Sequence, residues 1–200
     1  MSIETNILNE LKKKGTYVFC IKDMLKFGDY KSVAKAIERL TIKDEVKRLA
    51  QGIYYFPLVN KLFGIEYPPE IDAVAEALSR NNNWEIRETG ATALYKLGLD
   101  NQIPSKYIYL SSGPYRTYTI GNRIIEFKNA SQKNFVFSKV TSLIVQAIKE
   151  LGDKNITYQE IIKMSSFLNE EEKVTLLNEI MYAPVWMHQY IKDIGRRKLT

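Results

Sequence analysis

The chain has 200 residues, of which 45% are hydrophobic and 26% are charged, and its formal net charge is +6. These proportions are ordinary for a globular protein with one large or two small domains. No apolar run approaches the roughly 20 residues that cross a bilayer, and the N-terminal residues lack the layout of a signal peptide. The single cysteine, Cys20, excludes an internal disulfide framework. We therefore expect a cytoplasmic protein.

The positive charge is concentrated in the first part of the chain. Residues 1–60 hold 11 Lys and Arg against 7 Asp and Glu. A basic segment of this kind attracts polyanions, although net charge alone indicates only non-specific binding. The elements expected in this segment are therefore the first place to look for a nucleic-acid interface.

The local patterns of residues 1–57 predict a fixed order of short elements. They are a helix over 3–14, a strand over 16–21, a brief helix over 22–27, a longer helix over 30–42 capped by Asp29, and two strands within 46–57 that turn at Gln51-Gly52. This order of helices and strands is the one that a winged helix-turn-helix requires. We assign residues 1–57 to such a DNA-binding domain.

The predicted helix over 30–42 has two different faces. Apolar side chains at helical spacing form one stripe, made of Val33, Ile37 and Leu40. Cations lie on the opposite side, at Lys31, Lys35 and Arg39. A recognition helix in a major groove needs this arrangement, with Arg39 suited to guanine and the lysines to phosphate.

The hairpin that follows is expected to act as the wing. Its first strand is basic, and its aromatic return strand would pack on the preceding helices. The predicted DNA-binding residues are Tyr30, Lys31, Ser32, Lys35, Arg39, Lys47 and Arg48. Because Lys47 and Arg48 would neutralise phosphates, affinity should fall as salt rises.

Residues 58–69 contain a glycine and two prolines without a clear period, and we expect a linker there. Residues 70–200 then form a C-terminal α+β domain. Its first part predicts helices over 69–81 and 90–99 and strands over 106–112 and 116–130, the last a hairpin at Gly121-Asn122. From residue 138 onward the periodicity is helical. The strands of this domain therefore come early and its helices late.

Four blocks of the sequence resemble the AbiEi-type antitoxins of type IV (abortive-infection) toxin–antitoxin systems. They are AIERLTIKDEVKRLAQGIYYFP, TGATALYKLGL, KYIYLSSGPYRTYTIGNRIIEFKNA and APVW, in this order. The resemblance runs from about residue 3 to residue 195. It rests on the succession of short blocks and not on one catalytic signature.

This resemblance implies a function in transcription and in toxin control. It implies a winged helix that binds inverted repeats in its own promoter and represses it, and a C-terminal domain that counteracts a nucleotidyltransferase-like toxin. The resemblance also implies a basic surface on the C-terminal domain, matched here by Lys106, Arg116, Arg123 and Lys128. Binding as a dimer and cooperative binding of monomers both fit.

Other functions have weaker support in the sequence. A lone histidine, His188, and the lone cysteine cannot form a metal site that needs three or four protein ligands. SSGPYR at 111–116 lacks the spacing of a phosphate-binding loop. We expect no catalytic residues, no metal and no cofactor, and hence no enzyme. The alternative that remains is a protein-interaction module whose winged helix does not bind DNA.

Overall fold

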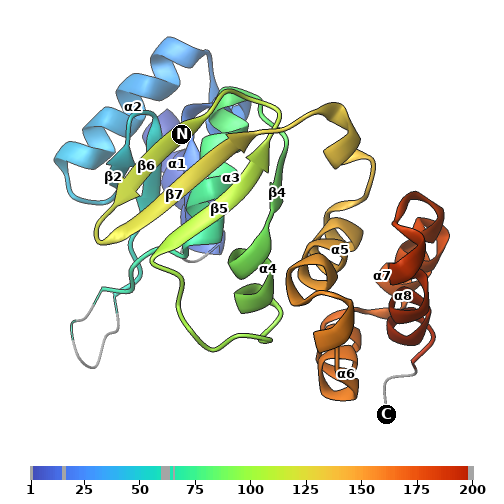
Figure 1. Ribbon diagram of the computed structural model, residues 1–200. Helices are drawn as coiled ribbons and strands as arrows, with labels where there is room; N and C mark the ends of the chain where they lie inside the picture. Colours follow the sequence, from blue (N-terminus) through green and yellow to red (C-terminus); the bar gives the residue numbers. More distant parts are fainter. Residues whose placement is uncertain (1, 15–16, 60–63, 65, 198–200) are drawn as a thin grey trace. The chain divides into compact units, whose positions relative to one another are not determined.

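The computed structural model, drawn in Figure 1, describes residues 2–14, 17–59, 64 and 66–197. By its internal contacts the chain divides into two compact units, Met1–Trp84 and Glu85–Thr200. Both units combine helices and strands, so the α+β class predicted from the sequence is confirmed. None of the helices in these described ranges has the length and apolar content needed to cross a membrane.

The first unit holds four helical segments and one small sheet among its described residues. In chain order, with η marking 3-10 helices, the elements are α1 (Ile3–Lys14), β1 (Tyr17–Cys20), η1 (Ile21–Phe27), α2 (Tyr30–Ile42), β2 (Lys47–Ala50), β3 (Ile53–Phe56) and α3 (Ile71–Asn82). The strands form an antiparallel sheet in the order β1-β3-β2. Through β3 these elements follow the predicted order, and Thr16 of the first predicted strand lies outside the described residues.

Apolar side chains of α1, η1 and α2 form the core of the first unit. The predicted stripe of α2 is buried here, since Val33 and Ile37 are fully buried and Leu40 is 1% exposed. Asp29 caps α2, as predicted, by accepting a hydrogen bond from the backbone N–H of Ser32 at 3.0 Å. These contacts fix the rotation of α2 about its axis and so decide which side chains face outward.

Helix α3 packs on the sheet of the first unit, whereas the sequence patterns placed it in the C-terminal domain. Arg80 of α3 donates two hydrogen bonds to the Asp23 carboxylate, each at 3.0 Å, and a third to the backbone oxygen of Val18 at 3.2 Å. Near the end of the helix, Lys22 donates to the side-chain oxygen of Asn83 at 3.0 Å. The first unit therefore extends beyond the predicted linker at 58–69, of which residues 60–63 and 65 lie outside the described residues.

The second unit has its strands early and its helices late, as predicted. Its strands and first helices are β4 (Ile86–Glu88), α4 (Gly90–Lys96), β5 (Lys106–Ser111), β6 (Arg116–Ile120), β7 (Arg123–Asn129) and η2 (Gln132–Phe135). Its later helices are α5 (Lys139–Leu151), η3 (Asp153–Asn155), α6 (Tyr158–Phe167), α7 (Glu170–Asn178), η4 (Ile180–Tyr182), η5 (Val185–Met187) and α8 (His188–Gly195).

The sheet of the second unit has the strand order β4-β5-β7-β6. The β6–β7 hairpin turns at the predicted Gly121, but β7 then pairs in parallel with β5. The helices that follow, drawn in orange to red in Figure 1, have their own core around α5, where Ile144, Ile148 and Met164 are fully buried. The second unit therefore presents both a sheet and a helical layer.

Candidate nucleic-acid interface

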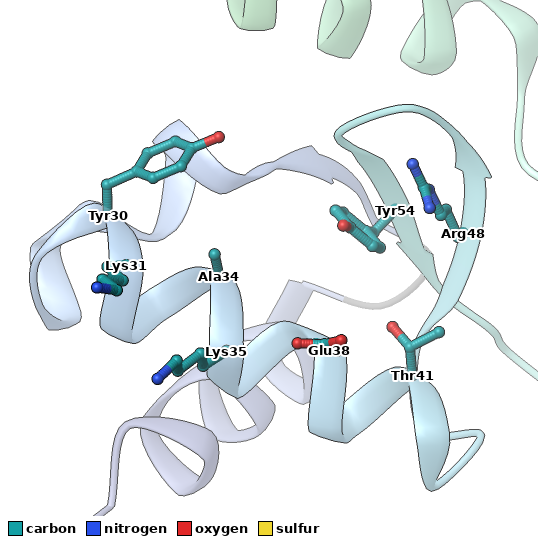
Figure 2. Close-up of a pocket in the computed structure, with 8 residues that line it drawn as sticks. All are labelled: Tyr30, Lys31, Ala34, Lys35, Glu38, Thr41, Arg48 and Tyr54. Carbon is teal, nitrogen blue, oxygen red and sulfur yellow. The ribbon is translucent and has the colours of Figure 1, made fainter.

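A concave surface of about 400 Å³ lies between α2 and the β2–β3 hairpin of the first unit (Figure 2). We call it the α2–hairpin groove. It is lined by Tyr30, Lys31, Ala34, Lys35, Glu38, Thr41, Arg48 and Tyr54. Six of these eight residues come from α2 and the other two from the hairpin.

The lining residues of α2 recur every three or four positions and therefore form one side of the helix. Ala34 lies in the middle of this side, and its small side chain leaves room between the helix and the hairpin (Figure 2). Across the groove, Arg48 of β2 is the antiparallel partner of Tyr54 on β3, so the two side chains share a face of the sheet. Phe19 of β1, the cross-strand partner of Tyr54, stacks on the Tyr54 ring at 5.9 Å between centroids.

The charges of the groove are mostly positive. Lys31, Lys35 and Arg48 are exposed cations, and Glu38 supplies a carboxylate. The Nε atom of Arg48 donates to the backbone oxygen of Ala50 at 3.3 Å, which leaves the outer nitrogens of the guanidinium available. Long cations around a concave surface suit a ligand with spaced negative charges, such as a phosphate backbone.

Two further cations, Arg39 of α2 and Lys43 directly after its end, lie on the side that faces α1 and not in the groove. Arg39 donates to one oxygen of Glu4 at 3.0 Å, and Lys43 donates to the other oxygen at 2.9 Å. These hydrogen bonds, that of Lys43 first, lower the pKa of the Glu4 carboxyl, so it stays ionised at neutral pH. Arg39, predicted to contact guanine, is therefore paired with a carboxylate beside a different, smaller hollow.

Lys47 also lies away from the groove. It is the cross-strand partner of Tyr55, and both side chains bind the carboxylate of Glu66. The hydrogen bond to Glu66 raises the pKa of Lys47, while burial first and then the same carboxylate raise the pKa of Tyr55. Because successive side chains of a strand alternate between faces, Arg48 faces the groove and Lys47 does not.

The remaining two predicted residues of the first unit lie near the start of α2. Tyr30 is 58% exposed at the rim of the groove. Ser32 lies on the side towards α1, and its hydroxyl donates to the Asp29 carboxylate at 2.7 Å. The groove thus brings together four of the seven predicted residues, Tyr30, Lys31, Lys35 and Arg48.

Four groove residues were not predicted from the sequence, namely Ala34, Glu38, Thr41 and Tyr54. Helical spacing from Lys31 would have found Ala34, Glu38 and Thr41, because they follow at intervals of three and four residues. Tyr54 depends on the pairing of the two hairpin strands, which sequence spacing leaves open.

The four basic residues predicted in the C-terminal domain do not form one surface. Lys106 of β5 and Lys128 of β7 share one face of the second unit's sheet. Arg116 pairs with Phe127, and Arg123 lies two positions before Ile125, which places both arginines on the opposite face at the level of the backbone. The structure therefore separates the lysines from the arginines.

Metal-binding and nucleophilic groups are sparse. Within the described ranges, no group of three or more His, Cys, Asp or Glu side chains is arranged to hold a metal ion. The imidazole Nε2 of His188 lies 3.0 Å from the backbone oxygen of Ala183. Cys20 is buried, and this burial raises the pKa of its thiol above the ordinary value, which disfavours the reactive thiolate.

Comparisons with known proteins gave one family match and a distant structural similarity. A family model described as "Family of unknown function (DUF6088)" matches residues 3–176. The comparison with curated proteins found no match. Among solved structures, the crystal structure of the RV2827C protein from Mycobacterium tuberculosis covers 99% of this chain and 82% of its own, at 10% sequence identity and a TM-score of 0.43. A similarity at this level assigns neither fold nor function.

Proposed function

The chain belongs to the family of unknown function DUF6088, and we propose that this member binds double-stranded DNA through a winged helix-turn-helix in its first unit. In this proposal, η1 and α2 form the helix-turn-helix, α2 is the recognition helix, and the β2–β3 hairpin is the wing. The element order and the sheet order β1-β3-β2 support this assignment.

The observation that carries the proposal is the difference in pairing among the cations of α2, of the residue that follows it and of the hairpin. Within the described residues, Lys31, Lys35 and Arg48 form no ion pair and share one groove. Arg39, Lys43 and Lys47 are each paired with a carboxylate. Unpaired cations gathered on the exposed side of a helix are typical of a nucleic-acid binding site.

The groove also suggests how DNA is read. Lys31 and Lys35 would bind phosphates or base edges in the major groove, and Arg48 would follow the adjacent backbone. Glu38 would accept a hydrogen bond from the amino group of cytosine, the base that carboxylates read in a major groove. Because Arg39 is paired with Glu4, we no longer place the guanine contact there.

The resemblance to AbiEi-type antitoxins extends the proposal to a biological role. We infer an autorepressor whose occupancy of promoter inverted repeats blocks transcription, and whose second unit counteracts a nucleotidyltransferase-like toxin. A specific feature of the second unit suits a protein partner. Apolar side chains on both sides of the buried Ala183 are exposed, with Met181 at 72% and Val185 at 81%. An exposed apolar stretch of this kind favours protein contact.

The DNA-binding proposal is tested by two triple variants of equal charge change. Fluorescence anisotropy with the upstream promoter duplex would be measured at several salt concentrations. Replacing Lys31, Lys35 and Arg48 by alanine should weaken binding by at least about 100-fold. The slope of log affinity against log salt should become less steep by about 0.9 for each phosphate that the variant no longer binds.

The matched control replaces Arg39, Lys43 and Lys47 by alanine, and it should retain binding within a few-fold. If this control loses as much affinity as the groove variant, general charge and not the α2–hairpin groove governs binding. In a co-expression growth assay with a nucleotidyltransferase encoded beside this gene, the groove variant should still rescue growth. Loss of rescue would indicate that DNA binding and toxin antagonism use the same surface, and it would contradict their assignment to separate units.

A further inference from the structure

The second unit contains a polar cleft that DNA binding by the first unit leaves unexplained. Its volume is about 550 Å³. We call it the lysine cleft. Its lining includes Lys106, Ile108 and Leu110 of β5, Lys128 of β7, and Gln146 and Lys149 of α5. All of these residues belong to the second unit.

Strand register explains why two of the lysines meet. Strands β5 and β7 run in parallel, with Lys106 opposite Ile124 and Leu110 opposite Lys128. Alternate residues of a strand share a face, so the lysines lie on the same face at its two ends. Ile108 lies between the two levels, Leu110 lies beside Lys128, and both apolar side chains are half-buried. Lys149 comes from α5, one turn after Gln146, and reaches the cleft from a different element.

A buried carboxylate holds the two sheet lysines in place. Glu126 of β7 is 3% exposed and forms an ion pair with Lys106, and Lys128 lies 3.8 Å from its other oxygen. The Lys106 hydrogen bond lowers the pKa of Glu126, and the same bond raises the pKa of Lys106, so both groups are charged at neutral pH. Both lysines remain about half exposed and can still reach a ligand.

The third lysine of the cleft, Lys149, differs from the other two in its pairing. Within the described residues Lys149 forms no ion pair, and it is exposed at the wall of the cleft. The cleft therefore offers three ammonium groups from three elements, of which Lys149 forms no ion pair within the described residues. Such a cluster attracts a phosphate group and gives it several charge-assisted hydrogen bonds.

The rest of the lining indicates more than a bare anion site. Ile108 and Leu110 provide an apolar floor, which an inorganic phosphate does not need but a flat heterocycle does. Gln146 and Asn134 add amides that can bond to the edge of a base. Glu150 lies beside Gly90, where φ is +46° and an added Cβ would come within 3.1 Å of the Glu150 carboxylate. Glycine at this position keeps that carboxylate free to accept from a sugar hydroxyl.

We propose that the lysine cleft binds a nucleoside phosphate, with its phosphate at Lys106, Lys128 and Lys149 and its base over Ile108 and Leu110. The ligand is either a free nucleotide or the phosphorylated end of a single strand, which share this chemistry. This site is distinct from the α2–hairpin groove and does not depend on the DNA-binding proposal.

Isothermal titration calorimetry of the full chain tests the proposal with ATP, GTP, CTP and UTP, with adenosine, and with inorganic phosphate. At least one triphosphate should bind at a single site, about tenfold or more tighter than adenosine or phosphate. A 5′-phosphorylated octanucleotide that binds tighter than any free nucleotide, and tighter than its unphosphorylated form, would identify a strand end as the ligand. The reverse order would identify the free nucleotide.

The variants are chosen to keep the buried Glu126 paired. Lys149→Ala should weaken nucleotide binding by about tenfold, whereas Lys192→Ala, an exposed lysine of α8, should leave it unchanged. The triple alanine variant at Lys31, Lys35 and Arg48 should also bind nucleotide as the parent does. The proposal is overturned if no triphosphate binds at millimolar concentration, if phosphate binds as tightly as triphosphate, if Lys149→Ala has no effect, or if the groove variant abolishes nucleotide binding.

Discussion

The two outward sides of α2 differ in what surrounds the cations on them. On the groove side, Lys31 and Lys35 are exposed and form no ion pair within the described residues, and Lys35 also borders the smaller hollow towards α1. On the other side, Arg39 and Lys43 share the carboxylate of Glu4, which comes from α1. A cation on a helix therefore indicates a binding site only when the neighbouring element brings no carboxylate to it.

The largest effect on stability should come from truncating a buried side chain that anchors α2 in the core. Ile37 of α2 is fully buried in the first unit's core, and Ile37→Ala should lower the free energy of unfolding by about 2–5 kcal/mol. Urea denaturation followed by circular dichroism measures this loss. Ile42 lies in the same helix but is 80% exposed, so Ile42→Ala should change stability by no more than about 0.5 kcal/mol. Similar losses in both variants would show that Ile37 does not belong to the core.

Single substitutions should separate the two sides directly. Lys35→Ala removes an unpaired cation and should weaken DNA binding by about tenfold at low salt. Arg39→Ala removes a cation that Glu4 already neutralises, so its effect should be within about threefold. Anisotropy titrations on one duplex compare them. A larger effect of Arg39→Ala would mean that DNA displaces Glu4 and uses the side of α2 that faces α1.

Releasing the paired side should convert it into a weak second phosphate contact. Glu4→Gln frees Arg39 and Lys43, and we expect tighter DNA binding with a steeper salt dependence, by up to about 2 in slope if both reach phosphates. Glu10→Gln is the matched control, because Glu10 also lies on α1 and pairs with Lys14 and Lys26. Equal tightening in both variants would show a general charge effect in place of local release.

The smallest effect concerns stability and pH. Because the folded pKa of Glu4 is lowered, its ion pairs stabilise the fold above the unfolded pKa, near 4.5, and this stabilisation is lost as pH falls through the folded pKa. Thermal unfolding from pH 7 to pH 3 should therefore show the parent and Glu4→Gln converging below about pH 4.5. A difference in melting temperature that stays constant over this range would contradict the assignment.

Local patterns predicted the features of the first unit that depend on neighbours in sequence. The apolar stripe of α2 follows from helical spacing, and Asp29 caps the helix because it stands just before it. The packing of α3 could not be predicted in this way, since Arg80 meets Asp23 from 57 residues away. The pairing of Arg39 with Glu4 is likewise a long-range contact.

The second unit shows a different limit of sequence reasoning. Strand alternation could have placed Lys106 and Lys128 on one face only if β5 were known to pair with β7. The sequence favours pairing of consecutive strands, and β6 comes between them. Lys149 reaches the lysine cleft from a helix after the sheet, so tertiary packing alone brings the three lysines together.

The buried Cys20 gives this protein an internal reporter of its own opening. Its thiol lies in β1, paired with Ile53 of β3, and is the only thiol in the chain. A thiol reagent can reach it only when β1 separates from the first unit's core, so the labelling rate under native conditions follows the opening equilibrium of that unit. Comparing the labelling rates with and without duplex DNA would then measure how much DNA binding stabilises the first unit against opening, without introducing a new cysteine.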